Sequence, residues 1–316
     1  MKTALFSFIP VSENSMVAST RIAAFVENEL QMPCIWNDMI ANQTDLDVLF
    51  IVNGAYAFCK VLEPLSLAIL GAKRIVWIQN DYTIVPPINN GQATSPFRKA
   101  FVARRVLGKP HLEYWTTCEK ESKATELSTY INWNSLSVRA KPLPANVNEN
   151  DLAYFGSYRN GRIKAFERYF DNPKCPITIS SPSKKFAERF RHAFIKHMGT
   201  VGDLSKWLSE RGLGLYLEDR KSHNEYHSPP NRFYEMLSAG LPMIFEQEAG
   251  MTLRRAGYNP EKYSVSNSLQ AARMMDQRDV IKKEQQQTWY NIAITERNGL
   301  GPRIKAAFRR LEATVA

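Results

Sequence analysis

Residues 228–245 read SPPNRFYEMLSAGLPMIF, and this stretch decides the fold. Two prolines fit the start of a helix, which predicts a helix over residues 232–239, and Gly240 ends it. The apolar run that follows directly is typical of a buried strand. Arg232 and Glu235 stand three positions apart near the helix start, so they share one helical face. The stretch therefore predicts a helix that leads into a strand of a parallel sheet, with an arginine and a glutamate near its N-terminal end.

Strand-like apolar runs alternate with helical stripes along the rest of the chain. Strands are expected at residues 3–9, 48–52, 74–78, 112–117, 152–155, 177–180 and 213–217, and helices at residues 19–30, 61–70, 162–169 and from about Val280 onward. Such alternation predicts doubly wound parallel sheets. Residues 140–150 hold two prolines and no periodicity, as an interdomain connector does.

We therefore predict an α/β protein with two Rossmann-like domains that face one another across a cleft. Residues 1–145 form the first domain and residues 146–280 the second. The C-terminal helix, residues 281–316, could pack back on the first domain. Ligands of such sheets bind at the carboxyl ends of the parallel strands.

Composition narrows the function classes. The chain has 316 residues, 44% of them hydrophobic and 23% charged, which excludes a disordered or fibrous protein. No apolar run approaches the roughly 20 residues that span a bilayer, so we expect a cytoplasmic protein. Four scattered cysteines favour buried thiols over disulfides or zinc. The net charge of +10 lies almost wholly in the second half, which suits a polyanionic partner, although solubility alone also explains it.

Residues 155–162 read FGSYRNGR and place a glycine and a serine between a strand and a helix. Such a turn aims backbone N–H groups at an anion, and Arg159 and Arg162 can complete a diphosphate site. The run lacks the G-x-G-x-x-G pattern of nicotinamide-binding folds. The alternative interpretation is an ordinary turn after a strand.

Asp81 follows the strand expected at residues 74–78 and precedes a loop, residues 86–96, that is long enough to be functional. A carboxylate at the end of a strand can remove a proton from an acceptor hydroxyl, although a lone aspartate is more often a turn residue. Asp45-Leu46-Asp47 precedes a strand, so we interpret it as a strand-entry turn and predict no protein-held metal site.

Two basic clusters flank the expected site. They are candidate contacts to a phosphate backbone, or else solvated helix faces, and their members are Arg98, Lys99, Arg104, Arg105 and Lys109 in the first half and Lys184, Lys185, Arg189, Arg191 and Lys196 in the second.

These segments, in this order, resemble the bacteriophage DNA β-glucosyltransferase family, whose members have the two-domain GT-B fold. The resemblance runs through residues 45–53, 67–70, the strand ending at Asp81, residues 156–159 and residues 232–240. It implies inverting transfer from a UDP-sugar, with UDP-glucose the expected donor, to a hydroxymethylated pyrimidine of double-stranded phage DNA whose base is flipped out. It also implies that the enzyme holds no metal tightly, although Mg²⁺ or Mn²⁺ could stimulate its activity. The resemblance further implies a monomer in the host cytoplasm without a membrane partner.

By the same resemblance the first domain lies on the side of the DNA acceptor, the second binds the UDP-sugar donor, and Asp81 matches the general base. Gly156, Ser157, Arg159 and Arg162 match the diphosphate-binding segment, and Arg232 with Glu235 match the phosphate and ribose contacts. Two other interpretations stay open: a GT-B enzyme acting on a bacterial surface glycan or a protein, and a non-catalytic DNA-binding protein that keeps the fold.

Overall fold

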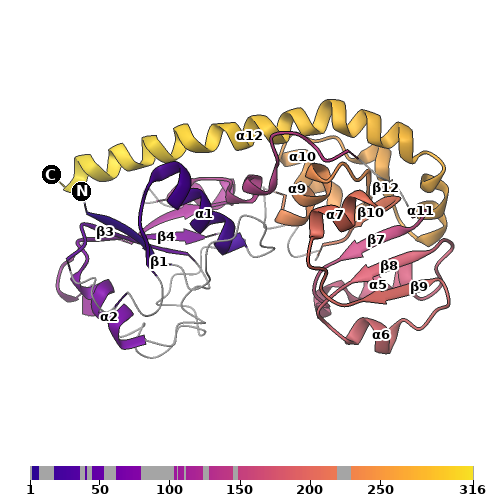
Figure 1. Ribbon diagram of the computed structural model, residues 1–316, viewed down its shortest axis with the longest axis horizontal. Coiled ribbons are helices and arrows are strands. Elements are labelled where there is room, and N and C mark those ends of the chain that lie inside the picture. Colours follow the sequence, from indigo (N-terminus) through magenta and orange to yellow (C-terminus); the bar gives the residue numbers. More distant parts are fainter. Residues whose placement is uncertain are drawn as a thin grey trace. The chain divides into compact units, whose positions relative to one another are not determined.

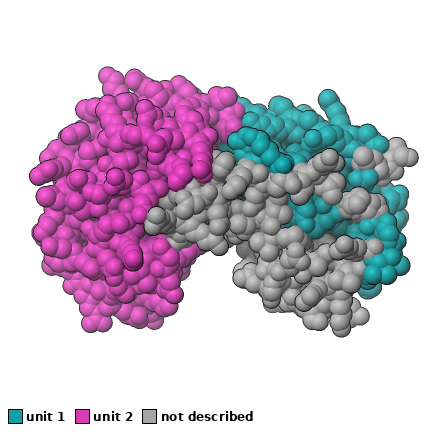
Figure 2. All heavy atoms as spheres, turned by 180° about the vertical axis from the view of Figure 1, so that it is seen from behind, with its two compact units in different colours: residues 1–136, 298–316 teal, residues 137–297 magenta. Residues whose placement is uncertain are grey.

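The structure is a computed structural model that describes residues 2–6, 18–35, 40, 45–52, 62–79, 103–104, 106–109, 112–123, 128–144, 149–218 and 229–315. The chain divides into two compact units (Figure 2). Unit 1 comprises residues 1–136 and 298–316, and unit 2 comprises residues 137–297. The predicted boundary after residue 145 lies a short way beyond this division, and the predicted break after residue 280 falls inside the last helix.

Unit 1 is built on a six-stranded sheet of order β2-β1-β3-β4-β5-β6, in which every pairing is parallel. Strands β1, β3 and β4 of this sheet are labelled in Figure 1. Its strands are β1 (Thr3–Phe6), β2 (Cys34–Ile35), β3 (Val48–Val52), β4 (Arg74–Gln79), β5 (Leu112–Thr116) and β6 (Ser128–Tyr130). Helices that the structure describes in full in this unit include α1 (Ala18–Leu30), α2 (Leu62–Gly71), the short α4 (Glu119–Ser122) and the 3-10 turn η3 (Trp133–Ser137). All five residues of β3 are buried, because this central strand has neighbours on both edges and packed side chains on both faces.

Unit 2 holds a second six-stranded parallel sheet, of order β12-β11-β10-β7-β8-β9. Its strands are β7 (Leu152–Phe155), β8 (Ile177–Ser180), β9 (Ile195–Met198), β10 (Leu213–Tyr216), β11 (Met243–Glu246) and β12 (Ser264–Val265). The helices are α5 (Ile163–Phe170), α6 (Lys185–Arg189), α7 (Leu204–Ser209), α9 (Asn231–Ser238), α10 (Gly250–Arg255) and α11 (Ser268–Met275), with 3-10 turns η4 (Asn160–Arg162), η5 (Gln247–Ala249) and η6 (Glu261–Tyr263).

Each unit has its own hydrophobic core. In unit 2, rings of Tyr154, Phe166 and Phe186 pack with centroids 4.9–5.7 Å apart between the sheet and helices α5 and α6. Such aromatic contacts add to the stabilisation from burial alone. This core holds β7, β8 and β10, whose carboxyl ends carry residues of the candidate site.

The last helix, α12 (Arg278–Val315), contributes to both cores. Trp289 and Ala293 are buried in the core of unit 2, whereas Ile304 and Leu311 are buried in that of unit 1. The predicted C-terminal helix is therefore present, and its final part belongs to unit 1. None of the helices in the described part of the chain has both the length and the apolar character needed to cross a membrane.

Candidate functional site

The turn after β7 is shaped by Gly156, whose φ of +136° is open to glycine and strained for other residues. Its N–H donates to the carbonyl of Ser180 at 3.0 Å, so it continues the pairing of β7 with β8. The predicted use of this N–H as an anion donor therefore does not fit the structure. What Gly156 supplies instead is space, because the residue has no side chain.

Arg232 occupies that space. A Cβ added to Gly156 would lie 2.3 Å from Nη2 of Arg232, so the guanidinium packs directly on the glycine. Its Nη1 donates to the carbonyl of Leu217 at 2.8 Å. The guanidinium also lies over the rings of Tyr154 and Phe155, at 5.2 and 5.5 Å from their centroids. Arg232 is the second residue of α9, and this packing sets it beside the turn that the sequence assigned to a diphosphate.

Glu218 joins the two arginines of the predicted donor site. It follows β10, its side chain is 4% exposed, and its Oε1 accepts from Nη1 of Arg232 at 3.1 Å. Its Oε2 accepts from Nη2 of Arg162, whose side chain is 3% exposed. Glu218 is not among the residues predicted from the sequence, although a carboxylate just after a buried strand is also the signal that points to Asp81.

Tyr216 lies at the end of the same strand, and these charges affect the pKa of its hydroxyl. Burial raises the pKa of its hydroxyl and Glu218 adds to the rise, while Arg232 and Arg162 act in the opposite direction. Among the residues that the structure describes, neither the Tyr216 hydroxyl nor Nε of Arg232 has a hydrogen-bond partner. Buried polar groups normally have hydrogen-bond partners, so a polar ligand bound here would supply the hydrogen bonds that these two atoms lack.

The other predicted donor residues lie around this cluster with their side chains accessible. Ser157 and Arg159 are exposed in the turn after β7. Glu235 is half-buried on α9, one turn after Arg232. The structure thus brings the Gly156 turn, Arg162 and the start of α9 together at the carboxyl edge of one sheet, which is where ligands of parallel sheets bind.

Lys184 and Lys185 stand at the same edge, at the start of α6 after β8. Both side chains are exposed, and Nζ of Lys185 lies 5.9 Å from the centroid of the Tyr158 ring. Arg159 is exposed after the neighbouring strand. This edge of the unit 2 sheet therefore carries an accessible basic stripe, which we define as Arg159, Lys184 and Lys185.

Arg104 and Lys109 have protein partners instead of an open surface. Arg104 is 4% exposed and donates to the carbonyls of Ile69, Ala72 and Lys73, where α2 ends. Lys109 donates to the carbonyl of Leu70 at 2.6 Å. The last turn of α2 contains no basic residue, so these two cations complement its carbonyls and its dipole.

That position also argues against a DNA contact by Arg104 and Lys109. The end of α2 leads into the first residue of β4, at the amino edge of the unit 1 sheet. Asp81 comes after the other end of β4, and it lies outside the described residues, as do Arg98, Lys99, Arg105 and the loop at residues 86–96. We therefore leave Arg104 and Lys109 out of the proposed DNA-binding residues.

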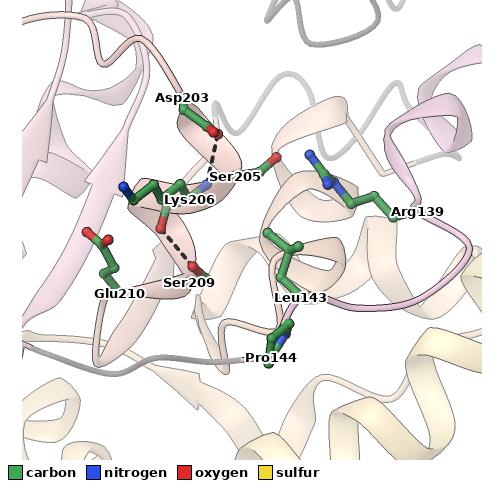
Figure 3. A pocket seen from close by; sticks show the side chains of 8 residues that line it. All are labelled: Arg139, Leu143, Pro144, Asp203, Ser205, Lys206, Ser209 and Glu210. Carbon is green, nitrogen blue, oxygen red and sulfur yellow. Dashed lines mark hydrogen bonds between the residues drawn. The ribbon is translucent and has the colours of Figure 1, made fainter.

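A hollow of about 300 Å³ also lies in unit 2, between α7 and the chain segment that precedes β7 (Figure 3). Its lining shares no residue with the cluster of Gly156, Arg162, Glu218 and Arg232, which we call the donor cluster. The lining consists of Arg139, Leu143, Pro144, Asp203, Ser205, Lys206, Ser209 and Glu210. Several of its polar groups serve α7 itself, since Asp203 accepts from the N–H of Lys206 and Ser209 donates to that residue's carbonyl. The hollow therefore carries no functional assignment.

The described part of the chain contains no second candidate site made of metal ligands or thiols. No group of three His, Cys, Asp or Glu residues there is arranged to hold a metal ion. Asp47 accepts from the N–H of Lys2 at 2.6 Å and pairs with Lys73 at 2.7 Å, as a strand-entry residue does. Cys34, Cys118 and Cys175 are not in disulfide bonds, and Cys59 lies outside the described residues.

Comparison with solved structures identifies the fold. The chain is similar to T4 phage β-glucosyltransferase in complex with UDP-glucose, with 15% identity, a TM-score of 0.69, and coverage of 98% of this chain and 99% of that one. A structure of the DNA-modifying enzyme β-glucosyltransferase matches with 13% identity and a TM-score of 0.67 over 98% and 99% of the two chains. Anabaena Alr3699/HepE in complex with UDP and glucose matches with 11% identity and a TM-score of 0.60 over 97% and 100%.

No protein-family model and no curated protein sequence matches the chain. The structural matches cover nearly the whole chain, and both six-stranded sheets are parallel. The predicted GT-B fold is thereby confirmed.

Proposed function

We propose that this protein is an inverting glycosyltransferase that moves glucose from UDP-glucose to a hydroxymethylated pyrimidine of double-stranded DNA, with the base flipped out of the helix. The observation that carries the proposal is the packing of Arg232 on Gly156 at the carboxyl edge of the unit 2 sheet. Structures with UDP-glucose or UDP and glucose as ligands have the same fold, which supports a nucleotide-sugar donor.

In the proposed donor complex the diphosphate lies against the Gly156 turn. Arg232 and the exposed Arg159 neutralise it, and Ser157 offers a hydroxyl beside them. The carboxylate of Glu235, one turn along α9, accepts from the two ribose hydroxyls. The hydrogen bonds of Arg232 and Arg159 to the diphosphate are charge-assisted, which makes them about twice as strong as neutral ones, and they gain strength as charge builds on the leaving diphosphate.

The chemical step uses Asp81 as general base. It removes the proton of the hydroxymethyl group, and the oxygen attacks the anomeric carbon of the sugar from the face opposite the diphosphate. A new carbon–oxygen bond forms to the base, the bond between the anomeric carbon and the phosphate oxygen breaks, and UDP leaves with the electron pair. Attack from the opposite face inverts the anomeric configuration, through a transition state with oxocarbenium character. A base inside the stack is out of reach, so flipping is part of the proposal.

We assign DNA-backbone contacts to Lys184 and Lys185 in the basic stripe. Each phosphate contact that is lost should lower the slope of log K against log salt by roughly 0.9. Lys184→Ala and Lys185→Ala should each flatten the slope by about that amount. Lys174→Ala is the matched control, because Lys174 is an exposed lysine just before β8, at the opposite edge of the same sheet. The slope measured for this variant should stay at the wild-type value. Equal slopes in all three variants would remove the stripe from the proposal.

The direct test of the reaction is nucleoside mass spectrometry. The protein is incubated with hydroxymethylcytosine DNA, hydroxymethyluracil DNA or unmodified DNA and a panel of UDP-sugars, and the DNA is then digested. We expect one hexose to be added to a hydroxymethylated nucleoside with UDP-glucose, and unmodified DNA to stay unchanged. Consumption of the donor without any nucleoside product would favour an enzyme acting on a glycan or a protein. DNA binding without donor consumption would favour a non-catalytic protein.

A further inference from the structure

Glu218 is the buried carboxylate on which the arginines of the donor cluster converge. One of its oxygens accepts from Arg232 and the other from Arg162. The three side chains are 4%, 12% and 3% exposed, so water screens their charges little. Without the carboxylate the two guanidinium groups would repel one another in a buried setting, and neither would keep its present place.

The contacts of Arg232 show what this pairing fixes. Nη1 is occupied by Glu218 and by the carbonyl of Leu217, and Nη2 lies against Gly156. Nε has no hydrogen-bond partner in the described part of the chain. A guanidinium group is planar, so two contacts on Nη1 set the direction of its remaining donors. Those donors are the ones left for a ligand beside the Gly156 turn.

We propose that Glu218 is a positioning residue for the donor diphosphate: by holding Arg232 and Arg162 on its two oxygens, it aims the remaining N–H donors of Arg232, on Nε and Nη2, at the phosphate groups. This inference rests on the proposed function, because it assumes a diphosphate ligand beside those donors. Glu218 itself does not contact the donor. Its effect should therefore appear in ligands that carry the diphosphate and be absent in those that lack it.

The test compares the dissociation constants of UDP and uridine by titration calorimetry. Glu218→Gln keeps the shape of the side chain and removes its charge. It should weaken UDP binding by about ten- to hundredfold, the worth of one charge-assisted hydrogen bond, while uridine affinity changes less than about threefold. Asp151→Asn is the matched control. Asp151 is a buried carboxylate paired with Arg211 at 3.1 Å, at the start of β7 and thus at the amino edge of the same sheet, so its loss perturbs unit 2 without touching the donor cluster.

A merely structural role for Glu218 predicts a different pattern, in which UDP and uridine affinities fall together, and that result would overturn the inference. Unchanged UDP affinity in Glu218→Gln would overturn it too. Should circular dichroism show that this variant is unfolded, Glu218→Asp replaces it: the shorter carboxylate keeps the charge but cannot reach both arginines, so UDP affinity alone should fall. Wild-type protein that binds UDP no better than uridine would instead refute the proposed diphosphate site itself.

Discussion

Replacing Gly156 with alanine is the substitution that the geometry of the donor cluster constrains most strongly. The new Cβ would lie 2.3 Å from Nη2 and 3.1 Å from Cζ of Arg232, well inside contact distance. The guanidinium group must then swing away, and it gives up its contacts with the Leu217 carbonyl and with Glu218. The backbone must also keep a φ of +136°, which alanine adopts only under strain.

Two costs follow from these changes. Backbone strain of this kind costs about 1–3 kcal/mol, and the loss of a hydrogen bond between charged groups about 1.5–3 kcal/mol. Because a moved Arg232 recovers part of the second cost in water, we expect the free energy of unfolding to fall by about 2–4 kcal/mol. UDP-glucose affinity should fall by at least about tenfold, since every 1.4 kcal/mol of lost binding energy is a factor of ten.

Urea denaturation and calorimetric titration of UDP-glucose measure the two effects separately. Gly257→Ala is the matched control, because Gly257 also has a positive φ, +88°, but a Cβ there meets no atom within 4 Å. This control bears the backbone strain alone and should leave donor affinity unchanged. Wild-type affinity for UDP-glucose in Gly156→Ala would show that the contact between Gly156 and Arg232 has no part in donor binding.

Three further predictions concern other parts of the chain. Glu235→Ala should raise the donor KM with little change in kcat, because a ribose contact acts equally in ground and transition states; an unchanged KM would refute the ribose assignment. Arg104→Met should lower the free energy of unfolding by about 2–4 kcal/mol through the lost α2 carbonyl contacts, while the salt dependence of DNA binding stays as in wild type; a flatter salt dependence with unchanged stability would return Arg104 to the DNA-binding residues. Burial, with a smaller effect of Glu27, raises the pKa of the Cys34 thiol from 9.0 to about 12. Between these two pKa values the folded thiol stays protonated while the unfolded one ionises. The contribution of this thiol to the free energy of unfolding is therefore fully present below about pH 8.5 and is lost as the pH rises toward 12. The denaturation midpoint should drop between pH 7.5 and about pH 10, and by less in Cys34→Ala; equal drops in the two proteins would show that the thiol does not contribute.

The central strands could be predicted from sequence because burial on both faces leaves an unbroken apolar run. The expected strand at residues 48–52 coincides with β3, and the one at residues 152–155 with β7. The edge strands could not be predicted in this way. The two-residue β2 and β12 are too short to show a period, and β9 reads Ile-Lys-His-Met, because an edge strand needs no continuous apolar side chains.

The candidate site was predictable where it follows from topology. Residues after parallel strands meet at one edge, so the Gly156 turn and Arg232 could be brought together from their positions alone. Sequence could not show that Glu218 would pair with Arg162, since the two lie 56 positions apart and meet only through packing. Nor could the sequence show that Lys109 bonds to a helix carbonyl while Lys184 and Lys185 are exposed. A run of basic residues has the same sequence pattern in both situations.

A crystal structure of the protein with UDP-glucose tests the central claim most directly, because the claim concerns where the nucleotide sugar binds. The account predicts that the diphosphate lies beside the Gly156 turn within hydrogen-bond distance of Arg232, with the ribose hydroxyls on Glu235. A nucleotide bound anywhere else, whether in the hollow beside α7 or on the unit 1 sheet, would contradict it.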